Sequence, residues 1–228
     1  MIVIKNNAAR SIIRAAVPFI VLPSLAVAGT MMFDKSRHLL ISLIAAAAAV
    51  VLFAAGFDKK KIGARRMVIC AVMIALAFVG RFIPFLNPIT AMAVITGIYM
   101  GSEAGFLVGS MSAVLSNFYF GQGPWTVFQM LAWGLIGFIA GAMAKPLKKN
   151  MALLLTYGAL SGVFYSLIMD VWTVLWYSRG FDLKMYGAAI VSAIPYTVNY
   201  AVSNVVFLIF LFTPFGDKLE RVRVKYGI

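Results

Sequence analysis

Cysteine, histidine and acidic side chains are scarce in this sequence of 228 residues. Cys70 is the only cysteine, His38 is the only histidine, and Asp and Glu together number seven. A single cysteine cannot form a disulfide within the chain, and one cysteine with one histidine cannot complete a Cys/His zinc site. Ser–His–Asp hydrolysis and most forms of haem ligation are excluded on the same grounds. We expect no cofactor, and any chemistry must proceed without imidazole.

Charge is sparse as well, whereas apolar residues are abundant. Charged residues make up 12% of the chain and hydrophobic residues 63%. A water-soluble domain of this size would leave large apolar patches exposed, so the expected solvent is the lipid bilayer. The net charge of +13 and the pI near 10.1 suit a nucleic-acid partner, but the basic residues form short clusters between apolar runs. We interpret these clusters as topology signals and expect no nucleic-acid partner.

Most of the chain falls into apolar stretches that can cross a bilayer as helices, each of which needs about 20 residues. The eight expected segments are Ile12–Phe33, Leu39–Phe57, Met67–Ile83, Ile89–Met100, Ala104–Phe120, Trp125–Ala144, Met151–Tyr177 and Tyr186–Phe212. The predicted fold class is therefore all-α, a polytopic membrane helix bundle of about eight transmembrane helices. The fourth segment would give only about 18 Å of helix, so it must be tilted, extended by irregular backbone or packed inside the bundle.

The basic residues divide unequally between the two sides of this arrangement. One side carries Lys5, Arg10, Arg14, Lys59, Lys60, Lys61, Arg65, Arg66, Lys145, Lys148, Lys149, Lys218, Arg221, Arg223 and Lys225, and the other carries Lys35, Arg37, Arg81, Arg179 and Lys184. The positive-inside rule places the first side, with both termini, in the cytoplasm. Ala26-Val27-Ala28 resembles a signal-peptide cleavage site, but the length of the first segment favours a membrane helix.

The basic stretch Asp58–Arg66 predicts a boundary between an N-terminal helix pair, residues 1–58, and a six-helix domain with a basic cytoplasmic tail, residues 59–228. Within the second part, glycines recur at intervals of three or four residues. They are Gly97, Gly101, Gly105 and Gly109, followed by Gly134, Gly137 and Gly141. Small residues at this spacing let helix backbones approach closely in lipid, so we expect these glycines to pack helices.

Asp170 is the only acid placed within an apolar stretch. A carboxylate in hydrocarbon is costly unless it faces protein, water or a cation, so Asp170 should face inward. Thr173 and Tyr177 lie on the same helical face. Two interpretations stay open, a hydrogen-bond anchor to a neighbouring helix and a contact to a ligand.

The stretch Ser116–Met130 joins two helices on the outer side and combines amides, aromatic rings and glycines. This mixture suits an organic ligand whose rings stack on apolar faces and whose polar groups fix its orientation. An interfacial aromatic belt is the alternative. With other polar and aromatic residues of the outer half, the stretch predicts one outward-facing cavity. The predicted substrate-binding residues are Arg81, Asn87, Asn117, Tyr119, Gln122, Trp125, Gln129, Asp170, Trp176, Tyr196 and Asn199, and Trp172 accompanies Trp176.

Ala71 and Ala75 lie four residues apart in the third segment. An Ala-x-x-x-Ala pair offers a smooth groove for another helix, although the motif is common in alanine-rich helices. No G-x-x-x-x-G-K-[ST] loop is present, so the chain cannot itself use ATP by that route.

From Arg65-Arg66 to about Phe215 the sequence resembles the membrane-embedded substrate-binding subunit, or S component, of energy-coupling factor (ECF) vitamin transporters. The resemblance rests on Ala71-x-x-x-Ala75, on the preceding basic loop and on the stretch ITGIYMGSEAGFLVGSMSAVLSNFYFGQGPWTVFQMLAWGLIGFIAG. It implies a non-enzymatic subunit in a bacterial plasma membrane, which partners a transmembrane coupling subunit and two cytoplasmic ATPases. By position, Ala71 and Ala75 match the contact motif for the coupling subunit.

The resemblance further implies that Asn117, Gln122, Trp125 and Gln129 belong to the outer loop region that helps to form the site. The expected ligand is a vitamin or cofactor precursor. Cobalamin is the best guess, with riboflavin, a pteridine or a queuosine precursor as alternatives. A polytopic membrane enzyme that uses Asp170 and a self-sufficient secondary transporter are competing hypotheses. Neither is favoured, because only one acid lies within the membrane segments.

Overall fold

The computed structural model describes residues 6–32, 38–56, 60–178 and 180–227, and every regular element among them is helical. The elements are α1 (Asn7–Ala16), η1 (Val17–Val21), α2 (Leu22–Met32), α3 (His38–Ala54), α4 (Lys60–Gly80), α5 (Ile89–Met100), α6 (Ser102–Phe120), α7 (Thr126–Ala142), α8 (Ala144–Lys149), α9 (Met151–Ser178) and α10 (Leu183–Tyr226). Each of the eight expected segments has a helical counterpart.

Four helices in the described part of the chain are long and apolar enough to cross a membrane. They are Asn7–Met31, Gly63–Gly80, Met151–Ser178 and Leu183–Tyr226. Leu39–Ala54, Ile89–Met100 and Thr126–Ala142 are shorter apolar helices. The prediction of an all-α, multi-pass membrane bundle is confirmed.

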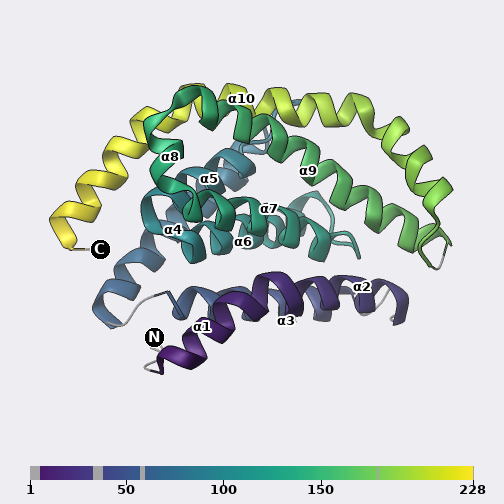
Figure 1. Ribbon diagram of the computed structural model, residues 1–228, viewed down its shortest axis with the longest axis horizontal. Coiled ribbons are helices and arrows are strands. Elements are labelled where there is room, and N and C mark those ends of the chain that lie inside the picture. Colours follow the sequence, from purple (N-terminus) through teal and green to yellow (C-terminus); the bar gives the residue numbers. More distant parts are fainter. Residues whose placement is uncertain (1–5, 33–37, 57–59, 179, 228) are drawn as a thin grey trace.

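The helices are arranged in layers (Figure 1). The N-terminal helices α1 to α3 form one side, the paired helices α6 and α7 lie in the middle with α5, and α9 packs along α10 on the far side. The short α5 is buried along its whole length except at Tyr99. Of the three alternatives for this segment, packing inside the bundle is therefore the one adopted.

Glycines bring α5, α6 and α7 into direct backbone contact. A Cβ added to either Gly97 or Gly105 would overlap the carbonyl oxygen of Gly137, and one added to Gly109 would overlap that of Trp133. For Gly97, Gly105 and Gly109 the interpretation as packing residues is confirmed, because no larger side chain fits at this seam.

Proline shapes two of the long helices. Pro18 lies in η1, a π-helical turn that carries the chain from α1 into α2 without a break. Proline has no backbone N–H to donate, and the wider π-helical turn lets the helix continue past this missing hydrogen bond. In α10, Pro195 and Pro214 lie inside a helix that arches over the bundle (Figure 1).

Helix α10 extends beyond the last expected apolar segment, which ends at Phe212. Helix α10 continues through Pro214 to Tyr226, so the basic tail is helical. Its final turns consist mainly of good helix formers and are held by neighbours. Lys148 Nζ lies 2.8 Å from Glu220 Oε2, and Arg65 Nη1 donates to the carbonyl oxygen of Tyr226 over 2.9 Å.

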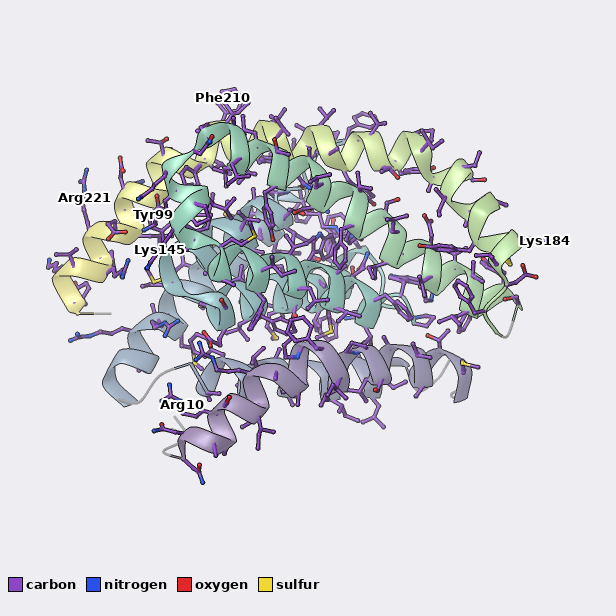
Figure 2. The ribbon with its side chains drawn as sticks, in the orientation of Figure 1. Arg10, Tyr99, Lys145, Lys184, Phe210 and Arg221 are labelled. Atoms are coloured by element: carbon purple, nitrogen blue, oxygen red, sulfur yellow. The ribbon has the colours of Figure 1, made fainter. Side chains whose placement is uncertain are left out.

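The two ends of the bundle differ in composition. We call the end formed by the start of α4, the α5–α6 and α7–α8 junctions and the C-terminal part of α10 the basic end. The opposite end, with connections 81–88 and 121–125, is the loop end. Figure 2 shows Tyr99 and Lys145 at the same end of the molecule as Arg10, with Lys184 at the other.

Candidate functional site

A chain of hydrogen-bonded polar side chains crosses the loop end. Arg81, just after α4, donates from Nη1 to Ser116 Oγ over 2.6 Å and to Asn117 Oδ1 over 2.9 Å, both on α6. The guanidinium also lies 4.7 Å from the centre of the Phe120 ring. The Arg81 charge is therefore held by a hydroxyl, an amide and an aromatic face.

Asn117 connects these hydrogen bonds to α7 and, through Gln129, to α9. Its Nδ2 donates to Thr126 Oγ1 over 2.9 Å and to Gln129 Oε1 over 2.7 Å, and Gln129 Nε2 donates to the Tyr165 hydroxyl over 3.0 Å. Asn117 is only 1% exposed. We call Arg81, Asn117, Gln129 and Tyr165 the amide relay, which links the end of α4 to α6, α7 and α9.

The loop between α6 and α7 is fixed by its own polar groups. Gln122 Nε2 donates to the Val114 carbonyl oxygen over 3.0 Å, and Thr126 Oγ1 donates to Gln122 Oε1 over 2.9 Å. The Trp125 ring folds back over Gly123, where any side chain would overlap it. The loop therefore presents Trp125 in one defined position.

Three tryptophans form a cluster beside this loop. The Trp125 and Trp172 rings meet edge to face with centroids 5.7 Å apart, and Trp172 stacks with Trp176 at 6.5 Å. We call Trp125, Trp172 and Trp176 the tryptophan cluster. Such an array presents both ring faces and ring edges to a planar ligand.

Two buried polar atoms on the same helix have no hydrogen-bond partner among the described residues. They are Asp170 Oδ2 and Trp172 Nε1. Asp170 is 7% exposed, so the prediction that it faces inward is confirmed. Side chains two positions apart on a helix point to different faces. Trp172 Nε1, whose ring packs on Trp125, is therefore the unpaired donor at the tryptophan cluster, and a ligand role for Asp170 stays a prediction.

Two predicted residues hold the connection 81–88 against neighbouring helices. Asn87 Oδ1 accepts from the Ile89 backbone N–H over 3.0 Å, and the Asn87 backbone N–H donates to Ser203 Oγ over 2.7 Å. Asn199 Nδ2 donates to the Phe85 carbonyl oxygen over 2.8 Å. In this conformation both amides position backbone.

Tyr119 and Tyr196 lie apart from the relay on the protein surface. Their side chains are 66% and 68% exposed, and Tyr119 packs against Phe82 with ring centroids 4.8 Å apart. A ligand role for these two residues stays a prediction.

The sequence analysis did not single out three residues that matter at these sites. Tyr165 completes the relay and stacks on Trp133 at 4.6 Å, and Thr126 bridges Asn117 and Gln122. Glu103, in the first turn of α6, is 2% exposed and forms an ion pair with Arg14 of α1. Two features of the sequence could have identified two of these residues. Tyr165 places a hydroxyl inside an apolar helix, and Thr126 directly follows Trp125.

The Ala71 and Ala75 side chains are exposed on the surface of α4. Larger apolar residues flank them along the helix, with Val68, Val72 and Val79 more than half exposed. This apolar face, which we call the α4 face, is free to receive lipid or another helix.

One protein family matches this chain. The family described as ECF-type riboflavin transporter, S component, matches residues 61–221. No curated protein and no solved structure matches the chain.

Proposed function

The chain belongs to the S components of ECF-type transporters, and we propose that its loop end captures a vitamin from outside the cell. S components are substrate-binding subunits rather than enzymes, and they work with a membrane coupling subunit and ATPases. The match covers α4 to most of α10, which includes all the helices that form the amide relay and the tryptophan cluster.

The observation that carries the proposal is the junction of the relay with the tryptophan cluster. Gln129 and Trp125 lie one helical turn apart at the start of α7, where the Gln129 backbone N–H donates to the Trp125 carbonyl oxygen over 3.0 Å. Ring stacking and directed amide hydrogen bonds therefore come from the same turn. A ligand that combines a flat ring system with a few polar groups uses both.

Riboflavin is the ligand that we favour within this class. The matching family is described as a riboflavin transporter component, whereas nothing supports cobalamin, the best guess from sequence. The isoalloxazine ring is flat, with one imide N–H between two carbonyl groups. Trp172 Nε1, beside the Trp125 ring, can donate to one of these carbonyl oxygens.

The remaining features follow from the same proposal. The loop end faces outward and both termini lie in the cytoplasm, as the distribution of basic residues predicts. The membrane is the bacterial plasma membrane that the family resemblance implies. The coupling subunit docks on the α4 face, around Ala71 and Ala75, and two ATPases complete the transporter. The helices α1 to α3 are an addition to the six-helix part, and α3 packs against α6.

A titration of the detergent-purified chain with riboflavin, followed by quenching of flavin fluorescence, tests the ligand. We expect saturable binding that Gln129→Ala weakens and that Tyr177→Ala, a change of an exposed aromatic at the end of α9, leaves unchanged. If the chain binds cyanocobalamin and does not bind riboflavin, the proposed ligand changes but the proposed site does not. Uptake by the chain alone in liposomes would overturn the dependence on partner subunits.

A further inference from the structure

The basic end contains a cavity that the proposed function does not use. Its volume is about 520 Å³, and it lies where α1, α4, α5, α6, α8 and α10 converge. The charged residues in its wall are Arg14, Arg66, Glu103, Lys145, Lys148 and Arg223. Figure 2 shows Lys145 beside Tyr99 at this end of the molecule.

Positive charge dominates the wall of this cavity, because five basic side chains face a single carboxylate. Glu103 is already paired with Arg14, and Glu220, just outside the wall, lies 2.8 Å from Lys148 and 3.5 Å from Arg223. Lys145 has no ion-pair partner within the described residues. The cavity therefore carries cations that its own carboxylates do not neutralise.

Arg66 is the most deeply placed of these cations, with 9% of its surface exposed. Its two terminal nitrogens donate to neutral acceptors, the carbonyl oxygens of Gly56 and Met100. Its Nε has no hydrogen-bond partner in the part of the chain that the structure describes. The guanidinium also lies 5.8 Å from the centre of the Phe53 ring, and Glu103, already paired with Arg14, is the carboxylate near it. A further anion in the cavity would stabilise this buried cation.

Backbone amides at the start of α6 add to the positive electrostatic potential of the cavity. Helix α6 begins at Ser102, and both Ser102 and Glu103 line the cavity. The first amides of a helix lack intrahelical acceptors and carry partial positive charge. Gly101 precedes them with φ of 98°, and a Cβ there would lie 2.9 Å from Arg66 Nη2, so only glycine keeps this corner open beside the guanidinium.

We propose that the basic cavity binds a phosphate-bearing anion. The phosphate would face the α6 N-terminus and Arg66, with Lys145 and Arg223 closing over it. Two sources share this chemistry, the headgroup of an anionic phospholipid and free phosphate. A basic pocket between membrane helices is a known form of headgroup site, and helix N-termini bind phosphate. The proposal does not depend on which vitamin the loop end binds.

Native mass spectrometry of the full chain in detergent, with added phosphatidylglycerol or phosphatidylcholine, tests the lipid source. Each cation near an anionic headgroup strengthens binding roughly fivefold, so Lys145→Gln with Arg223→Gln should weaken phosphatidylglycerol binding about 25-fold. The matched control is Arg221→Gln with Lys184→Gln, which removes the same charge outside the cavity wall. The control should bind like the unchanged chain, and phosphatidylcholine should bind far more weakly.

A second arm titrates the same proteins with inorganic phosphate and follows thermal stability. Stabilisation by phosphate that the cavity variant loses and the control keeps, without selective phosphatidylglycerol binding, identifies free phosphate as the source. The proposal is overturned if neither probe binds, or if the cavity variant and the control lose binding equally. The far-ultraviolet circular dichroism of both variants shows whether they are folded, and Lys145→Gln alone, expected to weaken binding about fivefold, replaces the double variant if that is unfolded.

Discussion

The loop end and the basic end handle polar groups in opposite ways. At the loop end, neutral amides and hydroxyls pair with one another across α6, α7 and α9 around a single guanidinium. At the basic end, five cations line an open cavity with one carboxylate. A relay made mostly of amides and hydroxyls holds helices in place and would discriminate ligands by hydrogen-bond geometry, whereas a cationic cavity would select by charge. If both proposals hold, one small bundle offers two binding chemistries, and separate substitutions should remove each without the other.

The largest expected effect is a loss of transport, caused by a change on the α4 face that leaves ligand binding intact. Ala71→Trp places a bulky ring on the α4 face, where it would block a docking helix. We expect riboflavin uptake by the assembled transporter to be abolished while the purified variant binds riboflavin with unchanged affinity. Uptake into proteoliposomes and fluorescence titration give the two readouts. Val79→Trp, farther along the same helix, is the matched control, and equal loss of uptake in both variants would remove Ala71 from the contact.

Breaking the amide relay should be the strongest change at the loop end. Asn117→Ala leaves Arg81 and Gln129 short of buried partners, at a cost of about 2 kcal/mol, equivalent to roughly 30-fold weaker ligand binding if it falls on the bound state. Asn150→Ala removes an amide at the basic end, where it accepts from the Leu153 N–H over 3.1 Å, and should leave affinity unchanged. Normal affinity in Asn117→Ala would place the ligand away from the relay.

Removing one ring of the tryptophan cluster tests whether the loop end and the basic end bind their ligands independently. Trp125→Ala removes one ring that meets Trp172 edge to face, and we expect about tenfold weaker riboflavin binding. The affinity of the basic cavity for phosphatidylglycerol should not change. A titration of each ligand against the same preparation checks both statements, and parallel loss of the two affinities would indicate general unfolding instead.

The smallest effect is expected from the acid at the basic end. Glu103→Gln removes the one carboxylate in the cavity wall and releases Arg14, so phosphatidylglycerol should bind about fivefold more tightly. Asp182→Asn, at the N-cap of α10 on the loop end, keeps the cavity unchanged and provides the control. Weaker lipid binding in Glu103→Gln would contradict the anion proposal.

The architecture was largely predictable because membrane constraints act locally. The length of the apolar stretches predicted the helices, and the glycine spacing predicted close helix packing, which the structure places between α5, α6 and α7. The helical extension of α10 beyond the apolar segment was not predicted, because the contacts that hold its final turns come from Arg65 and Lys148, distant in sequence.

The sites were harder to predict, because hydrogen-bond partners are chosen in three dimensions. Asn117 and Gln129 stood out as amides in apolar surroundings, but nothing in the sequence tied Tyr165 to them. Glu103 has the appearance of a turn residue, and its burial depends on packing by the N-terminal helices. Pattern reasoning finds unusual residue types, and it does not find ordinary residues that become important by position.

The most direct test is native mass spectrometry of the chain purified from a riboflavin-replete host, together with two variants. The account predicts a flavin mass on the unchanged chain and on the Lys145→Gln, Arg223→Gln variant, and its loss from Gln129→Ala. A flavin that survives Gln129→Ala but disappears with the basic-end variant would contradict the assignment of the vitamin to the loop end.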